Sequence, residues 1–153
     1  MAKLNKGCSR VFLDTNVYIV GASDLDGSEG KILQFLGFEE ANPDAPEVVI
    51  SKELVEQVLR VGKRLQGKDW ASNLMARIWR NFKLVYVLLN DDEFSAIAAQ
   101  GLIPREDIGV YLTAKQGNAE CFVSANYKLI RAMVDETEDF RCLTPTEFVK
   151  DLN

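Results

Sequence analysis

Residues 11–21 read VFLDTNVYIVG, and this stretch sets the fold expected for the chain. A short apolar run, typical of a buried strand, ends at Asp14, and the polar residues Thr15 and Asn16 follow it directly. In open α/β sheets, ligands gather outside the carboxyl ends of the strands, so polar residues at this position are candidates for a binding site. Asp, Thr and Asn are equally good turn and helix-capping residues, so plain capping is the competing interpretation.

Short apolar runs alternate with longer segments of helical periodicity along the rest of the chain. We expect strands at 10–13, 47–50, 84–89, 121–124 and 140–143. We expect helices at 31–38, from 52 onward, at 70–80, 91–100, 107–117 and 127–134, and after Thr144, with Gly21 interrupting the apolar segment 16–20. Buried strands that alternate with helices predict a parallel sheet with helices on both faces. The expected fold is α/β, with one domain over residues 1–153 and three α/β/α layers around a central parallel sheet of about five strands.

The composition is that of an ordinary globular chain, but it contains no histidine. Of the 153 residues, 47% are hydrophobic and 27% are charged. The absence of histidine excludes a Ser-His-Asp or Cys-His mechanism and the usual catalytic zinc site. An enzyme of this composition must rely on carboxylates, lysines, hydroxyls or a hard cation.

The cysteines and the apolar runs bear on the compartment. Cys8, Cys121 and Cys142 are an odd number with no close pair, which argues against a disulfide framework and favours a reducing compartment. The longest apolar stretch, 84–89, is far shorter than the roughly 20 residues that cross a bilayer, so no membrane partner is expected. Residues 1–10 carry no apolar signal region, and we expect a cytoplasmic protein.

The net charge of −5 counts against a nucleic-acid partner, but its distribution does not. Between Arg60 and Lys83 there are seven basic residues and one acidic residue, which leaves a net charge of −11 for the rest of the chain. A helical surface with such one-sided charge can bind phosphate, and a solvated helical face is an equally good interpretation of this feature alone.

Two further carboxylates, Glu56 and Asp107, are candidates to join Asp14. Glu56 lies at the edge of the apolar stripe of the helix that begins at residue 52; Glu53 shares its face, but the apolar positions flank Glu56 more closely. A solvated glutamate is the more common outcome at such a position, and an acid such as Asp107 at the start of a helix is favoured by the macrodipole alone. As a set, acidic side chains without His or Cys are the ligands of Mg²⁺ or Mn²⁺, which polarise phosphoryl oxygens.

Four segments, in this order, resemble the PIN-domain nucleases, including the VapC-like toxins. They are VFLDTNVYIVG at 11–21, VVISKELVEQVL at 48–59, REDIGVYLTAKQGNAECFVSANYKLI at 105–130 and LTPTEFVKDL at 143–152. Together they extend over nearly the whole chain, so the resemblance implies a PIN-like fold.

By this resemblance, the first three acidic residues of the family match Asp14, Glu56 and Asp107. The fourth position holds Asn126, where many relatives have aspartate, and Lys128 stands two residues on, where another acid is common. Three carboxylates and one amide are enough for one well-held metal ion and put a second ion in doubt. An amide oxygen can still bind a metal or orient a water, and Lys128 can pair with a phosphate.

The resemblance implies a divalent-metal-dependent endoribonuclease that hydrolyses phosphodiester bonds in single-stranded RNA with Mg²⁺ or Mn²⁺, as the toxin of a toxin–antitoxin pair does. The expected catalytic residues are Asp14, Glu56, Asp107 and Asn126, of which Asp14, Glu56 and Asp107 are metal ligands and Glu56 is alternatively a base. Supporting groups are expected at Thr15, Asn16 and Ser124. RNA is expected to contact Arg60, Lys63, Arg64, Arg77, Arg80 and Lys128. Besides RNA, the candidate partners are an antitoxin protein and a second copy of the chain.

Three other interpretations stay open. A catalytically weak or inactive PIN-like module that binds RNA or a protein would result if Asn126 weakens metal binding. A phosphate-binding or receiver-like α/β domain would use Asp14 as its strand-end acid, but it leaves the spacing of Glu56 and Asp107 unexplained. The third is a domain with a structural role only.

Overall fold

Within residues 7–126 and 140–152, which the computed structural model describes, five parallel strands form one sheet in the order β3-β2-β1-β4-β5. The strands are β1 (Arg10–Leu13), β2 (Glu47–Ser51), β3 (Leu84–Val87), β4 (Cys121–Val123) and β5 (Arg141–Leu143). Each neighbouring pair is parallel, so the predicted parallel sheet is confirmed.

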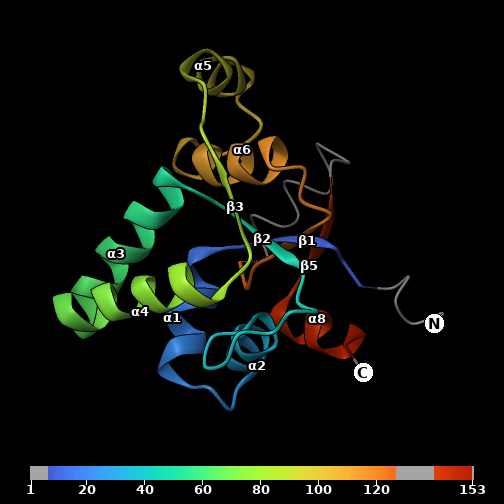
Figure 1. Cartoon of the computed structure of the whole chain (residues 1–153). Helices are drawn as coiled ribbons and strands as arrows, with labels where there is room; N and C mark the ends of the chain where they lie inside the picture. Colours follow the sequence, from blue (N-terminus) through green and yellow to red (C-terminus); the bar gives the residue numbers. More distant parts are fainter. Residues whose placement is uncertain (1–6, 127–139, 153) are drawn as a thin grey trace.

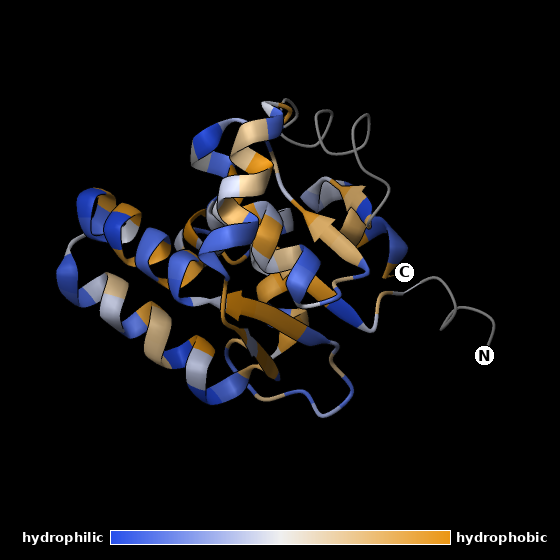
Figure 2. Cartoon of the chain, turned by 90° about the horizontal axis from the view of Figure 1, so that it is seen from above, coloured by the Kyte–Doolittle hydropathy of each residue, from blue (hydrophilic) through white to orange (hydrophobic). Residues whose placement is uncertain are grey.

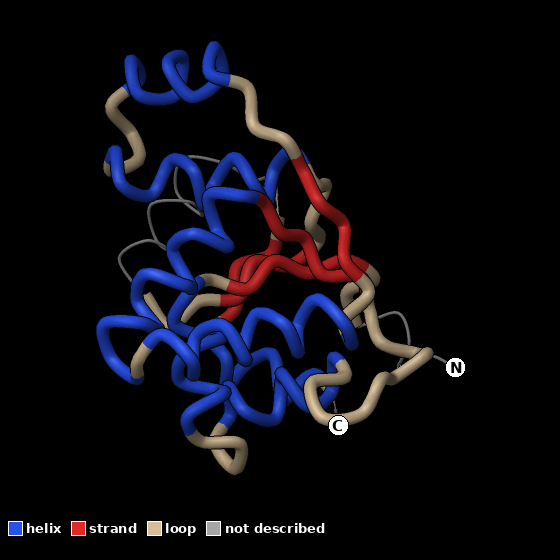
Figure 3. The backbone as a smooth tube through the Cα atoms, turned by 60° about the vertical axis from the view of Figure 1, so that its left-hand side comes forward, coloured by secondary structure: helices blue, strands red, loops and turns tan. Residues whose placement is uncertain are grey.

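Helices connect these strands and cover both faces of the sheet (Figure 1). They are α1 (Thr15–Ser23), α2 (Ser28–Leu36), α3 (Lys52–Gln66), α4 (Lys68–Asn81), α5 (Asp91–Gln100), α6 (Ile108–Gln116) and α8 (Pro145–Asp151), and the 3-10 turn η2 (Arg105–Asp107) precedes α6. α6 lies on one side of the sheet, while α2 and α8 pack together on the other. Figure 3 shows α5 standing out from the rest of the molecule, after the extended segment that follows β3. In the part of the chain that the structure describes, no helix is both long enough and apolar enough to cross a bilayer.

The order in which the strands are added to the sheet changes side at β1, in the centre of the sheet. From β1 the chain builds outward through β2 to β3, and it then returns to place β4 on the other side of β1. The register pairs Leu13 with Val123, so β1 and β4 end side by side. The residues that follow them, Asp14 and Ser124, therefore meet at a topological switch point, which is where α/β sheets bind ligands.

The same two strands form the middle of the hydrophobic core. Val11, Phe12 and Leu13 are fully buried, and the ring of Phe12 stacks on that of Phe122 with 5.0 Å between the ring centroids. Figure 2 shows the strands as hydrophobic and the surrounding helices as mixed along their length. Because β1 and β4 are buried on both faces, the positions of Asp14 and Ser124 are rigidly fixed.

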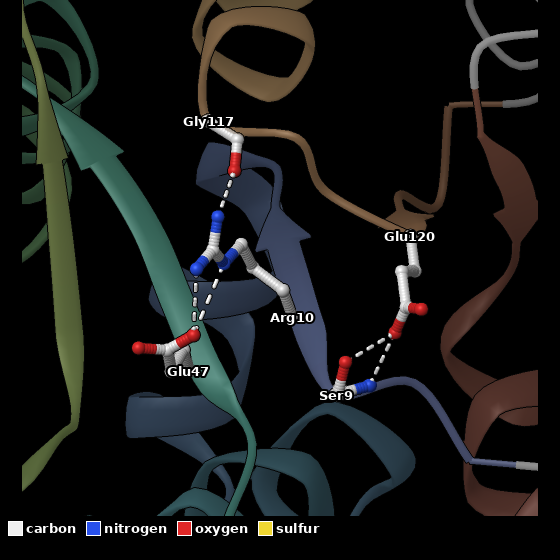
Figure 4. A network of polar contacts seen from close by, with 5 residues as sticks. All are labelled: Ser9, Arg10, Glu47, Gly117 and Glu120. Carbon is white, nitrogen blue, oxygen red and sulfur yellow. Dashed lines mark hydrogen bonds and ion pairs between the residues drawn. The ribbon is translucent and has the colours of Figure 1, made fainter.

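At the opposite end of the sheet, where the strands begin, polar side chains link separate elements (Figure 4). Arg10 donates through Nε and Nη2 to Glu47 Oε1 at 3.1 and 2.9 Å, and through Nη1 to the carbonyl oxygen of Gly117 at 3.0 Å. The backbone N–H and the hydroxyl of Ser9 both donate to Glu120 Oε1, at 2.5 and 2.7 Å, and these bonds lower the pKa of the Glu120 carboxyl. These hydrogen bonds and the Arg10–Glu47 ion pair hold the amino ends of the strands together.

Several element boundaries differ from the sequence expectation. Gly21 lies inside α1 and does not end it. A glycine is needed there because α2 packs so closely that a β-carbon would lie 2.8 Å from the carbonyl oxygen of Glu29. Helix α2 begins at Ser28, three residues before the expected start at Lys31, and β3 ends at Val87. The helix expected at 127–134 lies outside the described residues. The helix after Thr144 is confirmed, with a complete capping box.

Cys8 and Cys121 are joined as a disulfide in the structure, with their Cα atoms 6.0 Å apart; sequence reasoning argued against a disulfide framework and did not predict this single pair. Cys8 lies just before β1 and Cys121 opens β4, so the parallel pairing of these strands brings together two residues that are 113 positions apart. Cys142 is a free cysteine, and burial raises the pKa of its thiol to about 11.

Candidate functional site

Asp14 ends β1 as a buried carboxylate, with 7% of the residue exposed. Its Oδ1 accepts the backbone N–H of Thr15 at 2.8 Å, which makes Asp14 the N-cap of α1, and its Oδ2 accepts the hydroxyl of Ser124 at 2.7 Å. Burial raises the pKa of the Asp14 carboxyl, although the hydrogen bonds from Ser124 and Thr15 lower it in part. Asp14 therefore caps a helix and also keeps a desolvated carboxylate at the sheet edge.

Polar groups that follow β4 surround this carboxylate. The hydroxyl of Ser124 also accepts the backbone N–H of Asn126 at 3.0 Å. Asn16, in the first turn of α1, accepts the N–H of Ala125 at 3.4 Å through its side-chain oxygen. The structure thus brings the predicted residues Asp14, Asn16 and Ser124 together, with Asn126 next to them. Lys128 lies outside the described residues.

Gln57 of α3 joins this cluster, although sequence reasoning did not select it. The hydroxyl of Thr15 donates to Gln57 Oε1 at 2.7 Å, so the amide oxygen stands one residue from Asp14. Along α3 the buried positions are Leu54, Val58 and Gly62, and Gln57 flanks this stripe on the side of α1. Helical spacing alone could have drawn attention to Gln57, but it does not say which flank of the stripe faces the end of β1.

Among the described residues, no hydrogen bond or ion pair joins Glu56 to the Asp14 cluster. Glu56 is exposed and lines an open hollow of about 310 Å³ beside the site, together with Glu53, Leu54, Gln57, Arg60, Phe94, Arg105, Gly109 and Val110. Gln57 belongs to both places, so the hollow adjoins the ends of β1 and β4. The hollow contains carboxylates and guanidinium groups of opposite charge, and Arg105 lies over the ring of Phe94 with 5.7 Å between Cζ and the centroid.

Asp107 is half-buried and directly precedes α6. Its backbone N–H is accepted by the carbonyl oxygen of Pro104 at 2.8 Å. Gly109 and Val110, in the first turn of α6, line the hollow described above. The start of α6 therefore approaches the same region as Gln57, from across α3.

Of the predicted phosphate-binding residues that the structure describes, Arg60 alone is among those lining this hollow. Lys63 and Arg64 are exposed in the last turn of α3. Arg77 lies over the ring of Phe38, 4.9 Å from Cζ to the centroid, and Arg80 lines a different groove between α3 and α4. The basic residues of 60–83 therefore spread over the helical pair rather than forming one pocket.

Ser51, the last residue of β2, has a structural role. Its hydroxyl accepts the N–H of Leu54 at 3.2 Å and so caps α3. The same atom lies 2.7 Å from the hydroxyl oxygen of Thr113, inside the protein. Both interactions fix α3 and α6 against the sheet, so Ser51 supports the site without being part of it.

The donors at the strand ends fit one hard cation, with the Asp14 carboxylate among them. Among the residues that the structure describes, no three Asp, Glu, His or Cys side chains gather closely enough to hold a metal ion. The cluster instead presents the Asp14 carboxylate with neutral oxygens of amides and hydroxyls. Mg²⁺ is commonly held by one or two carboxylates, with waters and substrate phosphates as its other ligands. Asp14 is accordingly the carboxylate that a single ion would meet at this position.

Comparisons with known proteins support the fold. The structure of VapBC2 from Rickettsia felis bound to a DNA fragment from their promoter contains a similar chain, with a TM-score of 0.61, 13% identity, and coverage of 88% of this chain and 98% of that one. The structure of VapBC-1 from nontypeable Haemophilus influenzae is similar at a TM-score of 0.60 and 15% identity, covering 90% of this chain and 98% of that one. No protein-family model matches the chain, and no curated protein matches it. These likenesses show that the chain has the PIN-like fold of VapC-type proteins.

Proposed function

We propose that this protein is a divalent-metal-dependent endoribonuclease that hydrolyses phosphodiester bonds in single-stranded RNA. The observation that carries the proposal is the buried Asp14 carboxylate at the switch point of the sheet, next to an open hollow that contains Arg60 and Arg105. A desolvated carboxylate that is not paired with a cationic side chain in its described contacts is suited to a bound metal ion. The PIN-like fold gives the same expectation.

Each group in the region has a role in this proposal. Asp14 would hold Mg²⁺ or Mn²⁺, with Asn126 and Asp107 as further oxygen ligands, and the ion would supply polarisation of the phosphoryl group and activation of water. Ser124 orients the Asp14 carboxylate through its hydroxyl. Arg60 and Arg105 would bind the phosphodiester in the hollow, and Glu56, which lines the same hollow, would take the proton of the attacking water.

Substitution of Asp14 tests the proposal. The purified protein should cleave single-stranded RNA in Mn²⁺ or Mg²⁺ and lose the activity in chelator. Asp14→Asn should lower the cleavage rate by roughly 100-fold or more, because it removes the charge of the main ligand and keeps its shape. Asp26→Asn, which changes an exposed carboxylate in the loop after α1, is the matched control and should cleave normally. Equal cleavage by the two variants would contradict the assignment of Asp14.

A specific observation favours a second candidate, a PIN-like module that binds RNA or a protein and cleaves weakly or not at all. The α3 residue that reaches Thr15 is the neutral Gln57, and Asn126 supplies an amide at the end of β4. A site with so little negative charge binds divalent cations weakly. RNA binding that is unchanged in chelator, without cleavage at any Mn²⁺ concentration tested, would establish this candidate.

The partners belong to the proposal as well. Both comparison structures are VapBC assemblies, so we infer an antitoxin chain as a partner, and a second copy of this chain as another. A small reading frame beside the gene, whose product co-purifies with this protein, would support the toxin role. The molar mass of the purified protein in solution decides between monomer and dimer.

A further inference from the structure

A second groove lies on the other flank of α3, away from the Asp14 cluster. It has a volume of about 410 Å³ and is lined by Val55, Met75, Ala76, Trp79 and Arg80. Val55 is adjacent in sequence to Glu56, which lines the first hollow. The two hollows therefore lie on either side of the first turns of α3.

Two exposed aromatic side chains stand at this groove. Trp79 is 56% exposed and Tyr86 of the edge strand β3 is 45% exposed. Their rings contact each other edge to face, with the centroids 5.9 Å apart and an angle of 74° between the planes. The contact holds the two rings in a defined arrangement while much of both stays open to solvent.

The position of Trp79 is not needed for the core. Helix α4 buries Ala71, Leu74 and Ile78, which form its inward stripe, and Trp79 lies outside that stripe. A large aromatic ring left in water on a helical surface is a common mark of an interaction site. The ring is therefore available to a partner.

The charge around the groove indicates which partner it fits. Arg80 lines the groove next to Trp79, and the segment from Arg60 to Lys83 carries seven basic residues against one acidic residue in a chain with a net charge of −5. An aromatic platform beside a guanidinium group, on a basic helical pair, is the combination that binds single-stranded nucleic acid through a stacked base and a neighbouring phosphate.

We propose that Trp79, supported by Tyr86, is a stacking site for an unpaired base of RNA, with Arg80 on the adjacent phosphate. The inference rests on the proposed function in taking RNA as the ligand, and it adds a contact outside the Asp14 site. A strand that crosses the first turns of α3 would reach both Trp79 and the hollow at Arg60.

Binding to a labelled oligouridylate in chelator, followed by fluorescence anisotropy, tests the stacking site without any cleavage. Trp79→Ala should weaken binding by about tenfold, because it removes one stacked base. Trp79→Phe keeps an aromatic face and should stay within about threefold of the unsubstituted protein. Leu65→Ala, which removes another exposed apolar side chain of the helical pair, is the matched control and should leave binding unchanged.

An abasic oligonucleotide of the same length separates stacking from charge. It should bind more weakly than the oligouridylate, and Trp79→Ala should not weaken it further. Equal binding of the oligouridylate by Trp79→Ala and the unsubstituted protein would overturn the proposal. A dimer in solution that Trp79→Ala dissociates would also overturn it, since the groove would then hold a second copy. Failure of Asp14→Asn to affect cleavage would leave this result in place, so the two proposals fail separately.

Discussion

Asp14 shows how one residue satisfies two interpretations that the sequence presents as competitors. It caps α1 through Oδ1, and its Oδ2 is held by Ser124 at the carboxyl end of the neighbouring strand. A capping role alone needs one oxygen and does not require burial. The second hydrogen bond and the 7% exposure keep a carboxylate in an environment that raises its pKa, which a bound cation would offset.

We expect Gln57, whose Oε1 accepts the hydroxyl of Thr15 next to Asp14, to influence how strongly the site binds a cation. Gln57→Glu keeps the size of the side chain and places a second negative charge beside Thr15. We expect the dissociation constant for Mn²⁺ to fall by about tenfold, because affinity for divalent ions rises with the number of charged ligands. Calorimetric titration measures this without reference to activity.

Glu56→Gln is the matched control for that substitution, since it changes the adjacent position in the opposite sense. Glu56 is exposed in the hollow, so its loss should leave Mn²⁺ affinity within about threefold. If Glu56→Gln abolished Mn²⁺ binding and Gln57→Glu left it unchanged, Glu56 would be the ligand, as the sequence predicts.

Sequence reasoning at the residue scale reached the strand ends, and it did not select Gln57 on the flank of α3. The rule that ligands gather at the carboxyl ends of parallel strands placed Asp14, Asn16 and Ser124 together, because these residues directly follow buried strands. The choice between Glu56 and Gln57 depends on how α3 is rotated against α1. That rotation is set by packing between elements, and periodicity in one helix does not contain it.

At the scale of elements, replacing two glycines inside helices is expected to affect stability in opposite directions. A β-carbon on Gly21 of α1 would lie 2.8 Å from both the Glu29 carbonyl oxygen and Leu33 Cδ1, whereas on Gly109 of α6 it would lie 3.7 Å from the β-carbon of Glu53. Alanine is the better helix former at both positions. Close packing against α2 therefore decides the first case, and helix propensity decides the second.

We predict that Gly21→Ala lowers the free energy of unfolding by about 1–2 kcal/mol, since overpacking outweighs the gain in propensity. Gly109→Ala should raise it by about 0.5–1 kcal/mol. Urea denaturation of both variants measures the difference. Stabilisation by both substitutions would show that α1 and α2 separate easily at this point.

The same contact explains why element boundaries were harder to predict than element types. Most of the expected strands and helices are found. Gly21 was expected to interrupt the segment, because its local sequence does not show that α2 packs against it. The pairing of Cys8 with Cys121 was missed for a similar reason, since only the order of strands brings them together. Capping signals such as Ser51 and Thr144 are local, and both were predicted correctly.

At the scale of the whole molecule, the amino and carboxyl ends of the strands have different roles. The amino ends are tied by Arg10 to Glu47 and Gly117, and by Ser9 to Glu120. The carboxyl ends keep Asp14 and an adjoining open hollow. Charge is divided as well, because the segment that contains α4 is basic while the remainder of the chain is strongly acidic. Long-range repulsion from the acidic remainder would direct an RNA strand toward the α3–α4 pair.

This division of charge predicts that RNA affinity depends on where charge is changed and not only on how much. Reversal at two basic positions of α4, Arg77→Glu with Arg80→Glu, should weaken oligouridylate binding and reduce the slope of log affinity against log salt by about 1–2, since roughly two phosphate contacts are lost. The matched control reverses Lys31 and Lys150, which lie in α2 and α8, outside the α3–α4 pair, and produces the same net charge. Anisotropy titrations at several salt concentrations, with thermal denaturation to exclude unfolding after loss of the Arg77–Phe38 contact, measure both effects. Equal changes in slope for the two double variants would mean that net charge alone governs binding, and that the α3–α4 pair is not the RNA-binding surface.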